Sequence, residues 1–113
     1  MRVPFAAGLM LLICGILLGR AAQAVEPTTF TLSLKDHKFT PSELTIPANI
    51  RVRLVVKNLD ATPAEFESDD FKAEKIIPAG GEGVLLIGPL KPGSYEFHDE
   101  YHEDASKSRL IAK

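Results

Sequence analysis

Ten consecutive residues near the carboxyl end hold the densest group of metal-binding side chains in this sequence. The segment from Tyr95 to Asp104 contains two of the three histidines and five of the fifteen acidic residues. Alternation along the strand expected here puts Tyr95 and Phe97 on the buried face, and Asp99 follows on that face as the strand ends. A buried carboxylate is costly unless it is paired or metal-bound. Asp99 and His102 therefore form a candidate ligand pair, and a solvated acidic loop is the alternative.

The other histidines and a second acidic segment are weaker candidates. The same alternation points His98 toward solvent. His37 follows the first expected strand in a polar turn, where we expect a surface histidine. Glu65 and Glu67 flank Phe66, and two solvent-facing acids beside a buried aromatic ring are the simpler interpretation.

The amino-terminal segment has the features of a secretory signal peptide. Arg2 precedes an apolar run, and Ala22-Gln23-Ala24 matches an A-x-A cleavage signature. We therefore predict a secretory signal peptide over residues 1–24 and one secreted domain over residues 25–113. A retained membrane anchor is disfavoured, because the uninterrupted apolar core is shorter than the about 20 residues that a spanning helix needs.

Composition excludes several function classes. Cys14 lies within the predicted signal peptide, so the mature chain offers no thiolate to a metal and no cysteine nucleophile. Without Arg2 and Arg20, 11 basic residues remain against 15 acidic residues, a net charge of −4. This balance argues against nucleic acid as a partner, because phosphates require a basic patch. No G-x-S-x-G motif is present.

Short strands are expected throughout the mature chain. Period-two alternation or short apolar runs mark residues 30–34, 44–46, 51–57, 75–77, 84–87, 94–98 and 110–112. Turn-rich segments separate them, and no stretch has helical periodicity. About seven or eight short strands with this spacing predict an all-β protein, a Greek-key antiparallel β-sandwich.

Several segments of the sequence resemble the cupredoxin-like domain family. They are Phe39–Ala48, Val56–Asp60, Glu65–Ser68, Glu74-Lys75, Gly88–Phe97 and His102. Within that family, the acidic motif Glu65–Ser68, the turn Gly88–Gly93 and His102 are similar to EfeO-like periplasmic domains associated with bacterial iron uptake. The resemblance covers nearly all of the mature chain and implies a cupredoxin-like sandwich.

The sequence departs from the blue-copper members of this family at the metal ligands. Those proteins place a cysteine after the aromatic strand, then a histidine and a methionine. Here Asp99 stands near the cysteine's place, His102 at the histidine's, and Ser106 or its neighbours at the methionine's. The upstream histidine looks replaced by the region of Ala64 and Glu65. Because a blue-copper site is defined by copper–thiolate bonding, it is excluded here.

The resemblance instead implies a site of carboxylates and histidine. The principal metal ligands that it implies are Glu65, Glu67, Asp99 and His102. Additional metal ligands are sought among Glu74, His98, Glu100 and Glu103. Oxygen ligands with histidine suit iron, manganese, zinc or copper(II). The family's association points to an iron ion, with a copper ion second.

The predicted function is therefore a secreted, periplasmic, cupredoxin-like metal-binding protein that serves iron uptake by capture, oxidation or delivery of iron. Its expected partners are the metal ion and a membrane iron permease or another periplasmic iron-uptake component. Turnover is not expected, and ferroxidase-type oxidation is the weak alternative. A second hypothesis is a copper(II)-binding or copper-handling redox protein. A third is a β-sandwich interaction module with a non-metal acidic docking face.

Overall fold

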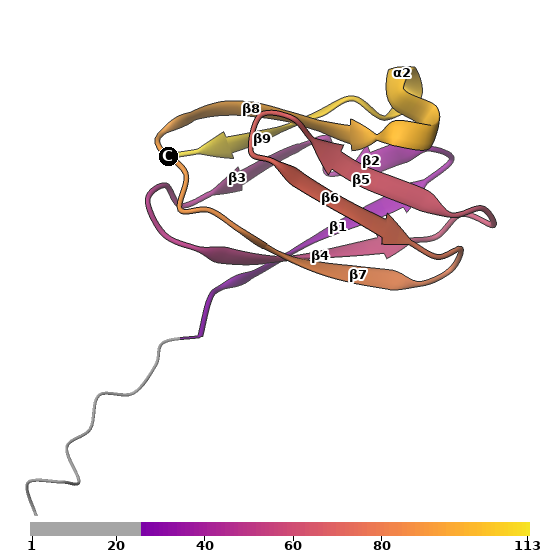
Figure 1. The fold of residues 1–113 in the computed structure, drawn as a ribbon, viewed down its shortest axis with the longest axis horizontal. Helices are drawn as coiled ribbons and strands as arrows, with labels where there is room; N and C mark the ends of the chain where they lie inside the picture. The colour runs from indigo at the N-terminus through magenta and orange to yellow at the C-terminus, as the bar shows by residue number, and fades with distance from the viewer. Residues whose placement is uncertain (1–25) are drawn as a thin grey trace, which may run out of the picture.

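The fold is a β-sandwich (Figure 1). It is taken from a computed structural model that describes residues 26–113, so the predicted signal peptide lies outside the described residues. The strands are β1 (Thr29–Lys35), β2 (Lys38–Thr40), β3 (Glu43–Ile46), β4 (Val52–Asn58), β5 (Ala64–Ser68), β6 (Ala73–Ile77), β7 (Glu82–Ile87), β8 (Gly93–Asp99) and β9 (Ser108–Ala112). Between β8 and β9 lie the 3-10 helix η2 (Glu100–His102) and the short helix α2 (Glu103–Ser106). Across the described part of the chain, no helix is long and apolar enough to span a membrane.

The sandwich predicted from the sequence is confirmed, with two differences in strand pairing and number. One sheet has the order β2-β1-β4-β7 and the other β3-β9-β8-β5-β6. β1 pairs with β4 in parallel, and so does β3 with β9, so both sheets are mixed rather than purely antiparallel. The chain crosses to the second sheet for β3 before β4 returns beside β1, and such a crossover is what permits parallel pairing.

Two strands, β2 and β5, were not expected from the sequence. β2 has three residues and folds back on β1 through Asp36 and His37, pairing Lys35 with Lys38. β5 has alternating buried and half-buried residues, with Phe66 fully buried between Glu65 and Glu67. Glutamate is depleted in strands, so the sequence signal was weak. Pairing with strands on both sides nevertheless holds β5 in the sheet.

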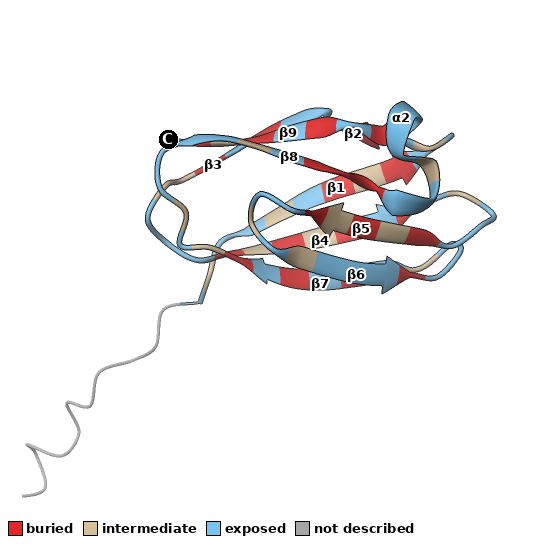
Figure 2. Ribbon diagram, turned by 45° about the horizontal axis from the view of Figure 1, so that its top comes forward, coloured by how far each residue is buried: buried red, intermediate tan, exposed pale blue. Residues whose placement is uncertain are grey.

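Aromatic side chains fill the core at the end of the sandwich where β8 terminates. Phe97 packs against Phe66 and against Phe39, with ring centroids 5.2 Å apart in both pairs. Alternating buried and exposed positions along the strands are visible in Figure 2. These aromatic contacts tie β2, β5 and β8 together directly beneath the polar residues of the candidate site.

Candidate metal centre

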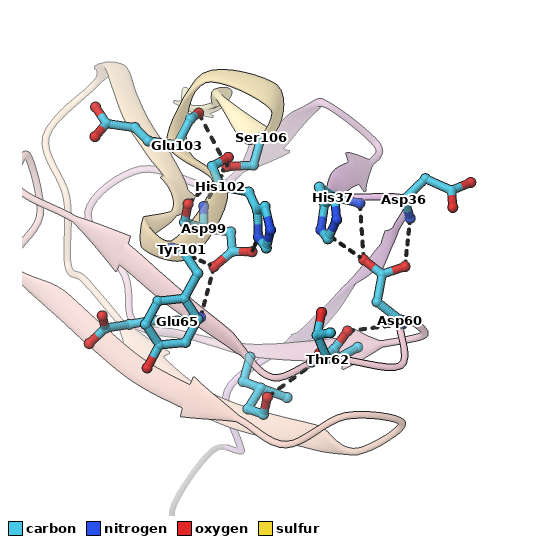
Figure 3. A network of polar contacts seen from close by, with 12 residues as sticks. Asp36, His37, Asp60, Thr62, Glu65, Asp99, Tyr101, His102, Glu103 and Ser106 are labelled. Carbon is cyan, nitrogen blue, oxygen red and sulfur yellow. Dashed lines mark hydrogen bonds and ion pairs between the residues drawn. The ribbon is translucent and has the colours of Figure 1, made fainter.

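The end of β8 turns sharply into η2, and Asp99 organises this turn. The backbone N–H of Tyr101 donates to Asp99 Oδ1 at 3.1 Å, which caps η2. The same oxygen accepts from the backbone N–H of Glu65 at 2.9 Å. Asp99 is only 1% exposed, on the core face that alternation predicts. Two amide donors satisfy one oxygen of this buried carboxylate and leave the other directed toward His102 (Figure 3).

Ser106 closes the same turn from the carboxyl side of α2. Its buried hydroxyl accepts from the backbone N–H of Asp99 at 2.7 Å and lies 2.8 Å from the carbonyl oxygen of His102. These contacts hold η2 and α2 against the end of β8. His102 therefore has a defined position, with Nδ1 3.4 Å from Asp99 Oδ2.

His98 is not exposed, contrary to the sequence-based prediction. Its side chain retains 8% of its accessible surface, although it points to the outer face of the sheet as alternation predicts. Nε2 lies 2.9 Å from Glu100 Oε1 and 3.8 Å from Glu67 Oε2, whereas the buried Nδ1 has no hydrogen-bond partner. The two glutamates cover the imidazole, which explains why alternation alone predicted the wrong exposure.

A row of carboxylates crosses the outer face of the five-stranded sheet around His98. Strand register puts Glu74 opposite Glu67, and Glu67 opposite His98. Glu65 and Glu100 extend the row, and we call these five residues the acidic face. Like charges directly opposite each other destabilise a sheet. Among residues 26–113, no ion pair joins these carboxylates to a lysine or arginine.

The crowding of carboxylates shifts their acidities. The hydrogen-bonded carboxyl of Glu74 raises the pKa of Glu65 above its ordinary value, and burial raises it further. Burial, and then the neighbouring carboxyl of Glu100, raise the pKa of Glu67. The hydrogen bond from His98 lowers the pKa of Glu100. The acidic face is thus short of positive charge, because no lysine or arginine pairs with its carboxylates among residues 26–113.

His37 joins the site, although the sequence suggested only a surface histidine. Its ring stacks on that of His102, with centroids 3.5 Å apart and an interplanar angle of 13°. It is half-buried, and Figure 3 shows it beside Asp60 at the turn between β1 and β2. The two histidines are far apart in the chain, and no local pattern links them. Only the return of the β1–β2 turn to this end of the sandwich brings them together.

The predicted ligands divide between two groups rather than forming one. Glu67, His98 and Glu100 have ligand atoms within 4.8 Å of one another, and so do His37, Asp99 and His102. The first group is part of the acidic face, and we call the second the pole cluster. Whether either group binds a metal stays a prediction.

Three other residues named from the sequence, Glu65, Glu74 and Glu103, fall outside both groups. Glu65 reaches the pole cluster only through its backbone N–H, while its carboxyl lies beside Glu74. Glu103 is exposed at the start of α2. Its backbone carbonyl oxygen accepts a hydrogen bond from the hydroxyl of Ser106.

Comparison with known proteins identifies the family of this chain. The family model described as a cupredoxin-like domain matches residues 8–112. The chain therefore belongs to the cupredoxin-like domain family, in agreement with its two-sheet fold. It is 38% identical over 80 residues to the uncharacterized protein RP394 of Rickettsia prowazekii (strain Madrid E). That alignment covers 71% of this chain and 64% of the relative, less than two thirds of the relative's length.

Solved structures share the fold at low sequence identity. A copper binding protein in the apo form has a TM-score of 0.68 at 19% identity, covering 81% of this chain and 93% of its own. Reduced auracyanin from Roseiflexus castenholzii has a TM-score of 0.64 at 18% identity, covering 79% and 99%. A purple cupredoxin from Nitrosopumilus maritimus has a TM-score of 0.57 at 15% identity, covering 76% and 99%. At these identities the likeness shows the fold alone.

The ligand chemistry of this chain does not fit a blue-copper ion. Residues 26–113 contain no cysteine, and the buried side chain at the end of β8 is the carboxylate of Asp99. A copper–thiolate bond is therefore not available among the described residues. Oxygen atoms and imidazole nitrogens are the donors present, and they fit divalent or trivalent ions of harder character.

Proposed function

We propose that this protein binds a metal ion at the acidic face and that the ion is iron, held as cargo for uptake. The observation that carries the proposal is the approach of two carboxylates, those of Glu67 and Glu100, to the imidazole of His98. The carboxyls of Glu74 and Glu65 lie beside them, with no lysine or arginine paired to the four among the described residues. A cation in this position removes the repulsion between carboxylates that face each other across strands.

The donor set supports a hard cation. Glu67 and Glu100 provide carboxylate oxygens on either side of His98 Nε2. A metal-binding imidazole is usually oriented by a partner on its second nitrogen, and Nδ1 of His98 has none. The carboxylates are therefore the principal ligands, and oxygen-rich sites select hard ions. The choice of iron rests on this hardness and on the resemblance to EfeO-like domains.

The accessibility of the ligands supports capture and release rather than permanent retention. The side chain of Glu100 is 45% exposed and that of Glu67 is 21% exposed, so an ion can enter and leave from the sheet surface. In this proposal, residues 1–24 are the signal peptide that directs export of the protein to the periplasm. A membrane iron permease or another periplasmic iron-uptake component is the proposed recipient.

Copper(II) is the second candidate cargo. The solved structures that share this fold include a copper binding protein, which supports copper as a second candidate metal. Copper(II) also binds nitrogen and oxygen donors more tightly than the other divalent ions of its row. Affinity alone therefore cannot assign the role, and the position of the bound ion must be measured as well.

Calorimetric titration of the chain from Val25 to Lys113 tests the proposal, with Fe(II) under anaerobic conditions and with Cu(II) and Zn(II) in parallel. We expect Glu67→Gln and Glu100→Gln each to weaken Fe(II) binding by at least about tenfold, because each removes a charged oxygen ligand. Glu43→Gln, at an exposed position on β3, is the matched control and should bind as wild type.

Unchanged Fe(II) affinity in both Glu67→Gln and Glu100→Gln would show that the acidic face is not the site. Failure of the wild-type chain to bind any of the three ions would favour the interaction module instead. In that case the acidic face would be a docking surface for a basic partner.

A further inference from the structure

Two edge strands lie side by side at one edge of the sandwich, and they differ in how they are protected. β6 ends the five-stranded sheet and β7 ends the four-stranded sheet (Figure 1). β6 carries Glu74 and Lys75, and charged side chains commonly keep an edge strand from pairing with another chain. From Gly83 to Ile87, β7 has neither a charged residue nor a proline. The edge of β7 therefore lacks this protection.

The backbone of β7 presents a row of hydrogen-bonding groups at this edge. In an antiparallel pair, residues alternate between those that exchange both hydrogen bonds with the partner strand and those whose groups point away from it. The N–H of Asn58 donates to the carbonyl oxygen of Gly81 at 2.8 Å, so every second residue from Gly83 onward bonds to β4. The N–H and C=O groups of Val84 and Leu86 consequently point away from β4, toward the open edge.

The side chains along the same edge are apolar and accessible. Val84 is 49% exposed and Leu86 is 55% exposed, and they lie beside Val55 and Arg53 on the outer face of the sheet. A groove follows the edge between β7 and β6, with Lys75 on its β6 side. An open edge strand with an apolar centre is a place where another strand can add to the sheet.

The charges near the two ends of β7 fit a second copy of the same strand. When two copies pair antiparallel with Val84 opposite Leu86, apolar side chains meet each other. In this register Glu82 falls opposite Gly88 of the other copy. Arg51 Nε donates to the carbonyl oxygen of Gly88 at 3.4 Å. Because glycine has no side chain to intervene, the carboxylate of Glu82 meets the guanidinium of Arg51 at both ends of the pair.

We propose that the edge of β7 is a self-association surface, at which two copies of this chain pair antiparallel through Glu82–Ile87 with Val84 opposite Leu86. Their four-stranded sheets then form one continuous sheet. The partner is a second copy because the apolar centre and the oppositely charged ends complement themselves under a two-fold rotation. The acidic face belongs to the other sheet and remains accessible in this dimer, so the proposal does not rest on metal binding.

Sedimentation velocity of the chain from Val25 to Lys113, with chelator present and over about a hundredfold range of concentration, tests the proposal. We expect wild type to shift from monomer to dimer as the concentration rises. Val84→Lys puts a charge at the centre of the edge, so it should raise the dissociation constant of the dimer at least about tenfold. Thr31→Lys is the matched control, because Thr31 is exposed on the same face but on an interior strand. It should associate as wild type.

Charge reversal tests the register. Glu82→Arg and Arg51→Glu should each weaken the dimer, because each brings like charges together across the interface. The double variant Arg51→Glu/Glu82→Arg should recover most of the lost affinity. Both side chains are exposed, and circular dichroism of each variant checks that the fold is retained. A double variant that associates no better than the single variants would overturn the proposed pairing.

Hydrogen exchange examines the same edge residue by residue. In the dimer, the N–H groups of Val84 and Leu86 donate to the partner strand, so their exchange should slow as the concentration rises. The amides of Gly83 and Leu85 already bond to β4 and should change less. Two further results would overturn the proposal. One is a wild-type chain that stays monomeric at every concentration, which would leave the edge to a strand of a different protein. The other is a dimer that Val84→Lys does not weaken.

Discussion

Two neighbouring residues at the end of β8 belong to different candidate sites. His98 points to the outer face of the sheet and meets Glu67 and Glu100, while Asp99 points to the core face and meets His102. Period-two alternation in a strand makes this division unavoidable. Because His98 and Asp99 face opposite sides of β8, substitutions around one of them leave the contacts of the other in place.

Glu74→Gln should make the metal-free protein more stable at pH 7. The Glu74 carboxyl is the main reason that the pKa of Glu65 is raised, and it lies directly opposite Glu67. A carboxyl whose folded-state pKa lies above its unfolded value binds protons more tightly when folded. Its stabilisation is full below the unfolded value, near 4.5, and is lost as the pH rises through the folded-state pKa.

Urea denaturation at pH 7 and pH 5, with chelator present, measures this effect. Wild type should gain stability between pH 7 and pH 5 through Glu65, and Glu74→Gln should gain less, because its Glu65 pKa is closer to the ordinary value. Glu43→Gln provides the comparison on an exposed part of β3. A Glu74→Gln protein less stable than wild type at pH 7 would contradict the prediction.

At the scale of elements, buried polar side chains hold the loops that surround the two clusters. Asn58 ends β4 and is fully buried. Its amide nitrogen lies 2.8 Å from the carbonyl oxygen of Thr62 and within 3.3 Å of those of Ile77 and Pro78, and its oxygen accepts from the N–H of Asp60. The loop carrying Asp60 is thereby fastened to the end of β6.

Asn58→Ala should lower the free energy of unfolding by about 3 kcal/mol, because it leaves several buried backbone groups without a partner. The β1–β2 turn should also loosen, since the carboxylate of Asp60 accepts the backbone N–H groups of Asp36 and His37. Hydrogen exchange of the Asp36 and His37 amides measures this second effect. Ser42→Ala, at an exposed position, should change the stability by less than about 0.5 kcal/mol. Equal stabilities of Asn58→Ala and Ser42→Ala would refute the structural role.

At the scale of the whole molecule, the two sheets have different outer faces. The four-stranded sheet presents Arg51, Arg53 and Lys57 near β4, whereas the five-stranded sheet presents the acidic face. The net charge of residues 25–113 therefore understates the local negative potential around His98. Such a potential concentrates cations at the surface of the five-stranded sheet.

Metal binding at the acidic face should stabilise the entire fold. An ion that binds only the folded chain, at 100 times its dissociation constant, adds about 2.7 kcal/mol to the free energy of unfolding. Mn(II), a hard ion that is stable in air, is a suitable probe for calorimetric melting with and without chelator. Glu67→Gln/Glu100→Gln should lose most of the Mn(II)-induced rise in Tm. If Mn(II) raised the Tm of that variant as much as it raises the Tm of the wild type, the ion would bind outside the acidic face.

The sequence by itself determined the sandwich, the buried position of Asp99 and the absence of a thiolate from residues 26–113. Alternation of apolar residues is a local pattern, and it was sufficient for most strands and for the core face of β8. Through its resemblance to the family, the sequence also predicted Glu67 and His102 as metal ligands. These features depend on neighbours in the chain or on composition.

Only the tertiary structure decided how the end of β8 is used. Strand register set Glu74, Glu67 and His98 side by side, and the covering glutamates buried an imidazole that alternation alone put in water. The return of the β1–β2 turn stacked His37 on His102. Contacts between segments distant in sequence leave no local pattern, so one predicted site became two candidate clusters only when the sheets were assembled.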